Sequence, residues 1–159
     1  MSASVPRRFY SAFAARDWKT LGALYADDAT FSDPAFADLN AEEVRAMWRM
    51  LLTRGKDLAV VYEVLKDTPN EAQARWTATY TFSQTGRKVK NVITATMQLR
   101  DGRIVRHVDV FDFHKWASQA LGPVGMLLGW TGWLRGKVQG KAMASLRDFM
   151  SKLASQGQT

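Results

Sequence analysis

The sequence predicts an α+β domain in which helices at both ends of the chain flank a curved antiparallel sheet. Apolar residues recur at helical spacing before residue 54, and a second helical stripe follows residue 134. Between them, residues 58–113 alternate with period two and are rich in Val, Thr, Tyr and Phe. We therefore expect a main unit at residues 1–113 and a helical extension at 114–159, packed on the same domain or on a dimer partner.

Composition limits the chemistry. The chain of 159 residues contains no Cys, which excludes disulfides, thiolate metal sites and cysteine nucleophiles. The first ten residues lack the apolar run of a secretory signal, so cytoplasm is the default expectation. The net charge of +7 is uneven, because residues 114–159 carry six Lys and Arg against one acidic residue, Asp148.

The N-terminal third predicts helices and one short strand. Residues 6–25 fit two short helices, with Asp17 placed to cap the second. Residues 29–33 predict a strand that stops at Pro34, which has no N–H for a ladder. Asp33 is therefore expected where a strand ends.

The next elements carry strong local signals. Asn40 and Glu43 have the spacing of a capping box ahead of a helix over residues 41–53, whose apolar stripe includes Trp48. Strands are expected at 58–66, 72–83, 88–100 and 103–113, with turns at Gly86 and Gly102. The middle of the chain therefore predicts an antiparallel meander.

The C-terminal third is apolar first and amphipathic afterwards. Residues 116–134 contain Pro123 and four glycines, features that disfavour a transmembrane helix. We expect a broken helical hairpin that covers a pocket mouth, packs on a dimer partner or lies on a membrane surface, because residues such as Trp130 and Trp133 need a cover. From Leu134 onward one helix face is apolar and the other is basic.

This order of elements resembles a known superfamily. The matching residues are 9–17 (FYSAFAARD), 24–34 (LYADDATFSDP) and the hairpin at 86–88 (GRK). They resemble the cone-shaped family of nuclear transport factor 2, ketosteroid isomerase and SnoaL-type polyketide cyclases, over residues 6–113. The resemblance implies a pocket inside a cone, but the fold hosts isomerases, cyclases, dehydratases, epoxide hydrolases and non-catalytic binding proteins.

In the ketosteroid isomerases the Asp before Pro is the general base, and a Tyr and a protonated Asp form the oxyanion hole. By that resemblance the base falls on Asp33, the tyrosine position on Phe9 and the second acid on Ala95. Two of the three groups are missing, so steroid isomerisation by the usual route is not expected. Tyr80, on a strand, is the better source of a hydroxyl.

Strand parity adds two ionisable groups to the expected pocket. His107 and Asp109 lie on one face of the last strand, and the resemblance turns that face inward. We predict Asp33, His107 and Asp109 as acid/base residues acting on a small apolar or polycyclic molecule. The predicted ligand-binding residues are Phe9, Trp48, Trp76, Tyr80, Phe82, Met97 and Phe111.

Alternatives remain at each position. Asp33 could simply close a turn, His107 could be a satisfied core residue and Asp109 could pair with an arginine at the rim. The whole chain could then be a non-catalytic ligand-binding or assembly module, or a peripheral membrane protein.

The motifs also set expectations about partners. The spacing of the two histidines predicts no metal site, and the sequence lacks the motifs of nucleotide cofactors or nucleic-acid binding. We expect a small apolar ligand, a homodimer and weak membrane-surface contact through the C-terminal helices.

Overall fold

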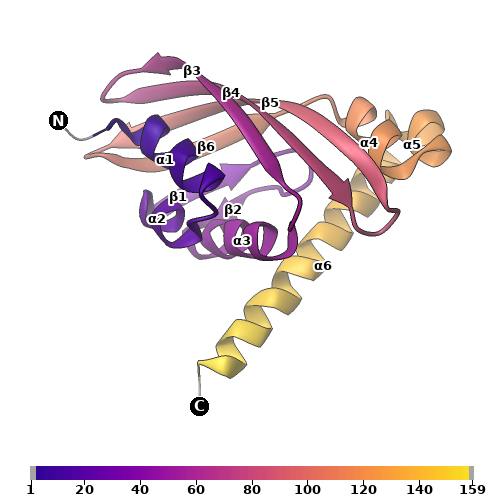
Figure 1. Cartoon of the computed structure of the whole chain (residues 1–159). Coiled ribbons are helices and arrows are strands. Elements are labelled where there is room, and N and C mark those ends of the chain that lie inside the picture. The colour runs from indigo at the N-terminus through magenta and orange to yellow at the C-terminus, as the bar shows by residue number, and fades with distance from the viewer. Residues whose placement is uncertain (1–2, 158–159) are drawn as a thin grey trace.

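The computed structural model describes residues 3–157, so the first two residues of the predicted segment 1–113 and the last two of 114–159 lie outside it. One sheet of six strands has the order β2-β1-β6-β5-β4-β3. Figure 1 shows this curved sheet with α1, α2 and α3 against one face and α4 and α5 at the far end, from which α6 runs back past α3 to the C-terminus. The predicted α+β architecture is confirmed.

Two N-terminal helices form as predicted, α1 (Val5–Ala14) and α2 (Trp18–Ala23). The Asp17 side chain caps α2 by accepting a hydrogen bond from the Thr20 N–H. Between the helices Arg16 adopts a positive φ of 59°. Its guanidinium donates to the carbonyl oxygens of Leu52 and Gly55, so the helical junction is fixed to the end of α3.

Strand β1 (Tyr25–Ser32) begins earlier than the sequence predicted. Tyr25 was expected to end a helix, but it is the first residue of the strand and is fully buried. Strand β1 pairs antiparallel with the short β2 (Leu39–Asn40) and parallel with β6. Because β1 and β6 are parallel, the predicted antiparallel sheet contains one parallel pairing.

Helix α3 (Ala41–Arg54) confirms the capping-box prediction. The Asn40 side chain accepts from the Glu43 N–H, and the Glu43 carboxylate accepts from the Asn40 N–H. Its apolar face, which includes Val44, Met47 and Trp48, is buried against the sheet and the N-terminal helices. The helix therefore covers one side of the main core.

The meander consists of β3 (Ala59–Asp67), β4 (Glu71–Phe82), β5 (Arg87–Arg100) and β6 (Arg103–Val110). Gly86 and Gly102 take positive φ in the two hairpin turns, as expected of turn glycines. Strand β6 ends three residues before the predicted Phe113. The Asp112 side chain accepts from the Lys115 N–H and caps a helix that starts at Phe113, which ends the strand pattern early.

The C-terminal third forms α4 (Phe113–Leu121), α5 (Pro123–Leu128) and α6 (Gly132–Gln156). Helix α6 packs on α3 through the fully buried Leu146, and the Arg54 guanidinium lies 5.4 Å from the Phe149 ring centroid. Its N-terminal part joins a second apolar cluster through Leu134. No helix within residues 3–157 is long and apolar enough to cross a membrane.

Candidate functional site

The inner face of the sheet brings the predicted acid/base residues to one end of the cone. In the parallel pairing, Phe31 of β1 lies opposite His107 of β6. The next inward position on β6 is Asp109, and Asp33 follows the end of β1 at the same level. The register therefore places Asp33 beside Asp109 on the inward face.

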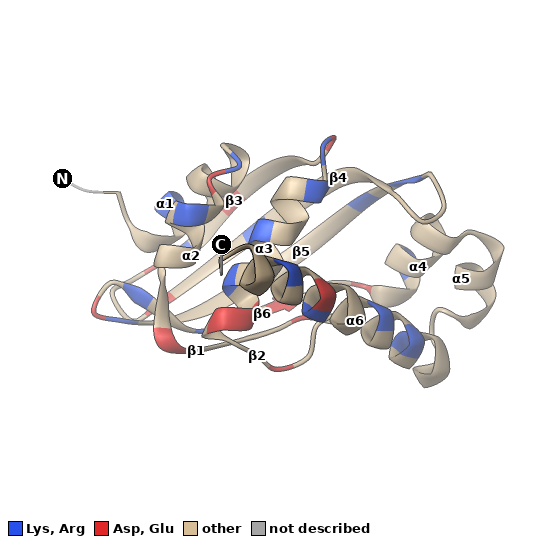
Figure 2. Cartoon of the chain, turned by 90° about the horizontal axis from the view of Figure 1, so that it is seen from below, with Lys and Arg blue, Asp and Glu red and all other residues tan. Residues whose placement is uncertain are grey.

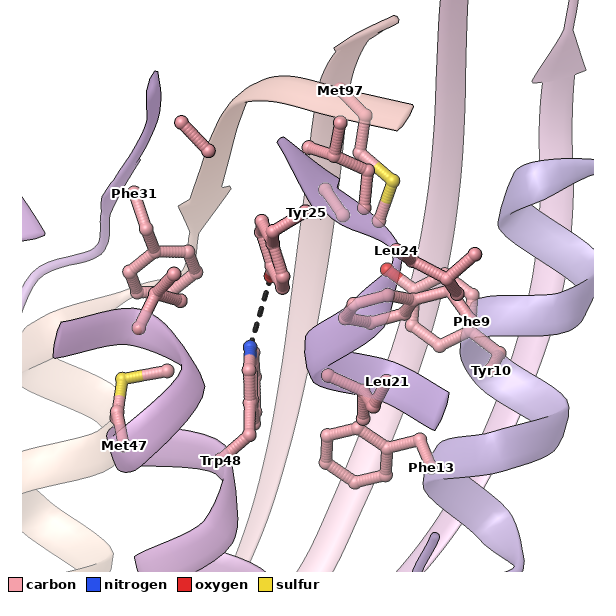
Figure 3. Packing of buried hydrophobic residues seen from close by; sticks show 14 of the residues in the cluster. Phe9, Tyr10, Phe13, Leu21, Leu24, Tyr25, Phe31, Met47, Trp48 and Met97 are labelled. Carbon is pink, nitrogen blue, oxygen red and sulfur yellow. Dashed lines mark hydrogen bonds between the residues drawn. The ribbon is translucent and has the colours of Figure 1, made fainter. Parts of the chain in front are cut away.

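A hydrogen-bonded chain runs through the buried end of this face. Trp48 Nε1–H donates to the Tyr25 hydroxyl at 2.9 Å, as Figure 3 shows, and the Tyr25 oxygen lies 2.7 Å from His107 Nδ1. His107 Nε2 in turn lies 2.8 Å from an Asp109 carboxylate oxygen. Tryptophan can only donate, so a consistent arrangement has Tyr25 donate to Nδ1 and Nε2–H donate to Asp109.

Aromatic rings enclose the His107 imidazole, the central group of these hydrogen bonds. His107 has 0% exposure and Asp109 has 3%. The centroids of the Phe31 and Phe9 rings lie 4.9 Å and 5.5 Å from that of His107, both in edge-to-face geometry. Because both ring nitrogens are engaged, His107 can hold and orient Asp109 but cannot itself touch a ligand in this conformation.

Asp33 lies nearer the surface and is only partly buried. Its Oδ1 accepts from the Ala35 and Phe36 N–H groups at 2.7 Å and 2.6 Å, which closes the turn through Pro34. Oδ2 has no hydrogen-bond partner among residues 3–157. Burial raises the pKa of Asp33 to about 7, the two N–H groups oppose that rise, and the negative charge of Asp109 adds to it.

Tyr80 and Asp33 are both partly buried and close enough to interact electrostatically, and we call the part of the inner face that they share the mouth of the cone. Its hydroxyl accepts from Trp116 Nε1–H at 2.8 Å, so its own proton stays available for another acceptor. Burial raises the pKa of Tyr80, and the charge of Asp33 raises it further. Helix α6 also reaches this turn, where the Gln139 side chain donates to the Pro34 carbonyl oxygen at 3.0 Å.

The predicted ligand-binding residues divide into two groups. Phe9, Trp48, Trp76 and Met97 are buried in the main core, where Phe9 and Trp48 pack edge to face. Tyr80, Phe82 and Phe111 are partly buried and contact the second cluster, near the C-terminal helices. Only the second group lies near the mouth. The first group is part of the buried core.

A family comparison identifies the domain. Residues 7–107 match the model of the SnoaL-like domain, which is more than half of the chain. The chain belongs to the SnoaL-like family. A comparison with curated proteins gives no match.

Solved structures share the fold of this SnoaL-like chain. A Catenulispora acidiphila protein with a ketosteroid isomerase-like fold, in complex with trimethylamine, has 13% identity and a TM-score of 0.64 over 77% of this chain and 96% of its own. IdmH from Streptomyces antibioticus, a proposed polyketide cyclase, has 23% identity and a TM-score of 0.60 over 72% and 94%. An M. tuberculosis LEH-like epoxide hydrolase has 17% identity and a TM-score of 0.58 over 78% and 92%. At these identities the likeness shows the fold alone.

Sequence reasoning missed two buried tyrosines of this SnoaL-like domain, Tyr25 and Tyr10. Tyr25 was assigned to a helix, although its position opposite the last strand makes it the link between Trp48 and His107. Tyr10 Oη and Trp76 Nε1 are buried without a hydrogen-bond partner among residues 3–157. Burial, and then the charge of Asp109, raises the pKa of Tyr10, so this hydroxyl keeps its proton. The inward direction of the two tyrosines could have been found by applying the side-chain periodicity of strands and helices to every polar residue.

The two grooves found on the surface lie outside the cone. One, of about 970 Å³, is lined by basic residues of β5 such as Lys88 and Lys90 together with α4. The other, of about 610 Å³, follows one face of α6 from Trp133 to Ala144. Within residues 3–157 no three His, Cys, Asp or Glu side chains are grouped to hold a metal ion.

Proposed function

We propose that this SnoaL-like protein is an acid/base catalyst for a small, largely apolar substrate that carries a carbonyl group, in an isomerisation, cyclisation or dehydration. The strongest support for this proposal comes from the properties of Asp33. It combines a strand-end position on the inner face, a free Oδ2 and a pKa raised to about 7. A carboxyl group with a pKa near the working pH can both accept and return a proton.

Each neighbouring residue has a distinct part in this proposal. Asp33 Oδ2 accepts a proton from a carbon next to the carbonyl, and the Tyr80 O–H donates to the oxygen on which charge develops. Burial, and then the charge of Asp109, keeps the pKa of Asp33 high, and His107 and Tyr25 hold Asp109 in place. The substrate lies between the Asp33 turn and the partly buried Tyr80 and Phe111.

Solvent proton exchange tests the chemistry without knowledge of the natural substrate. The protein is incubated in D₂O with a panel of cyclic and polycyclic ketones, and deuterium uptake is followed by mass spectrometry. We expect exchange with at least one ketone, slowed by about 10² to 10⁴ in Asp33→Asn because the base is lost. Tyr80→Phe should slow it by about 10² through loss of a hydrogen-bond donor.

Asp101→Asn is the matched control, because Asp101 is an exposed residue in the β5–β6 turn with a positive φ that Asn tolerates. Its exchange rate should equal that of the wild type. Equal rates in the wild type and Asp33→Asn would contradict the assignment of the base.

A second candidate is a non-catalytic ligand-binding module. The observation in its favour is that Asp33 Oδ1 already closes a turn and that His107 has both nitrogens engaged, as in a structural network. Ketones that bind, measured by quenching of tryptophan fluorescence, but that exchange no deuterium would support this candidate over the first.

A further inference from the structure

The most unusual surface of the molecule is a group of exposed apolar side chains between Gly122 and Leu134. Trp130 is 79% exposed, Leu127 is 72% exposed, and Met126 and Trp133 are each 61% exposed. Val124 and Leu128, in the same segment, are 53% and 36% exposed. We call these six residues the apolar tip. Large contiguous apolar surfaces are uncommon on soluble proteins and indicate a binding partner.

The α5 part of the apolar tip packs closely on α4. A Cβ on Gly125 would lie 1.8 Å from the Ala117 carbonyl oxygen, so α5 can approach α4 this closely only with glycine there. His114 Nε2 lies 3.0 Å from the Met126 carbonyl oxygen, the distance of an N–H donor bond. Because α5 packs this closely on α4, its residues Met126 and Leu127 are directed outward and are exposed.

Positive charge surrounds the apolar tip. The Arg87 guanidinium packs at Gly122, the Lys137 ammonium lies 5.3 Å from the Trp133 ring centroid, and Arg135 lies over Phe113. Lys141 lines the same α6 groove as Trp133. Figure 2 shows Lys and Arg recurring along α6. The sequence has no Asp or Glu from residue 113 to residue 147. We call Arg87, Arg135, Lys137 and Lys141 the basic rim.

This combination favours an anionic lipid bilayer over a second copy of the chain. Two copies that met through their apolar tips would bring two basic rims together, and residues 113–147 offer no acidic side chain to pair with them. A bilayer offers apolar depth for Leu127 and Met126, a headgroup layer suited to tryptophan, and negative charge for the rim. We propose that the apolar tip and the basic rim form a docking surface for anionic membranes.

Vesicle sedimentation of the full-length protein tests this proposal. We expect binding to vesicles of phosphatidylcholine with phosphatidylserine, weaker binding to phosphatidylcholine alone, and release at high salt. Lys137→Ala with Lys141→Ala should weaken binding by about 25-fold, or about fivefold for each charge removed. Lys19→Ala with Lys56→Ala, which removes two exposed lysines elsewhere, should leave it unchanged.

The apolar contribution is tested separately. Trp130→Ser with Trp133→Ser should abolish binding, whereas Val61→Ser with Val92→Ser, on exposed sheet positions, should not. Lipids brominated on their acyl chains should quench tryptophan emission of the wild type. Trp130→Phe with Trp133→Phe should keep most of the binding but lose the quenching. Unchanged circular dichroism and melting temperature would establish that each variant is folded.

Three results would overturn the proposal. One is no binding to anionic vesicles, and another is equal binding by the Ser variant of the tip and its sheet control. The third is a doubling of mass in light scattering that disappears in the Ser variant of the tip, because a second copy would then cover this surface.

Discussion

The two apolar clusters of this protein contain the same polar contact, a tryptophan Nε1–H that donates to a tyrosine hydroxyl. In the main core Trp48 donates to Tyr25 at 2.9 Å, and in the C-terminal cluster Trp116 donates to Tyr80 at 2.8 Å. The first contact continues through His107 to Asp109. The second stops at Tyr80. The same pair therefore fixes a buried network in one cluster and leaves a hydroxyl proton available at the mouth in the other.

The difference follows from burial. Tyr25 is fully buried, so its hydroxyl needs an internal acceptor, and His107 Nδ1 supplies one. Tyr80 is partly buried, so its proton can meet solvent or a ligand. Removing a polar group should accordingly affect stability in the main core and ligand chemistry at the mouth.

The largest effect is expected from His107→Ala. This change leaves Tyr25 without its acceptor and a buried Asp109 without its donor, and it opens a space among Phe9, Phe31 and Trp48. We expect a loss of about 4 kcal/mol in the free energy of unfolding, measured by urea denaturation.

The other histidine provides the control for this prediction. His114→Ala removes an exposed ring from α4 and should change the free energy of unfolding by less than about 1 kcal/mol. Similar losses in the two variants would refute the distinction between the buried network and the C-terminal cluster.

A smaller effect separates the two tyrosines directly. Tyr25→Phe leaves Trp48 Nε1 and His107 Nδ1 unpaired in the core and should lower the free energy of unfolding by about 2 kcal/mol. Tyr80→Phe unpairs only Trp116 Nε1, whose bond to Tyr80 is part-buried, and should lower the free energy of unfolding by about 1 kcal/mol or less. The reverse order in thermal or urea unfolding would show that the mouth, not the core, depends on its hydroxyl for stability.

The smallest expected effect is on how the stability of the protein changes with pH. The pKa of Asp33 is raised to about 7 in the folded chain, above the ordinary value of about 4, so folding favours its protonated form. Its contribution to stability is complete below about pH 4 and is lost as the pH rises through 7. Asparagine keeps the turn bonds but does not titrate.

Melting temperatures of the wild type and Asp33→Asn therefore test the raised pKa. The wild type should lose stability relative to the variant between pH 4 and about pH 7, and the difference should be constant above that range. Taking the difference removes the contribution of the exposed carboxylates, which both proteins share. A constant difference across the whole range would mean that Asp33 titrates like an ordinary carboxylate.

Sequence patterns were sufficient for most of the fold, because its signals are local. The capping box at Asn40 and Glu43, the cap at Asp17 and the turn glycines each involve residues a few positions apart. The errors fell where tertiary pairing overrides local pattern. Tyr25 continues a helical spacing but joins β1, and Phe113 continues a strand alternation but starts α4.

The candidate site was predictable only in part. Parity placed His107 and Asp109 on one face, and both are buried there. Parity could not show that both nitrogens of His107 are engaged, or that Tyr25 bridges it to Trp48, because these contacts join distant parts of the chain. The catalytic roles of Asp33, His107 and Asp109 stay predictions.

The parallel pairing of β1 with β6 has a consequence for folding during synthesis. Tyr25 and His107 are 82 residues apart in sequence, so the first strand leaves the ribosome long before its partner exists. Until then β1 can pair only with the two-residue β2. Pairings between distant segments slow folding and keep unpaired strand edges accessible to other chains. The step most exposed to misfolding is therefore the one that assembles Asp33, His107 and Asp109.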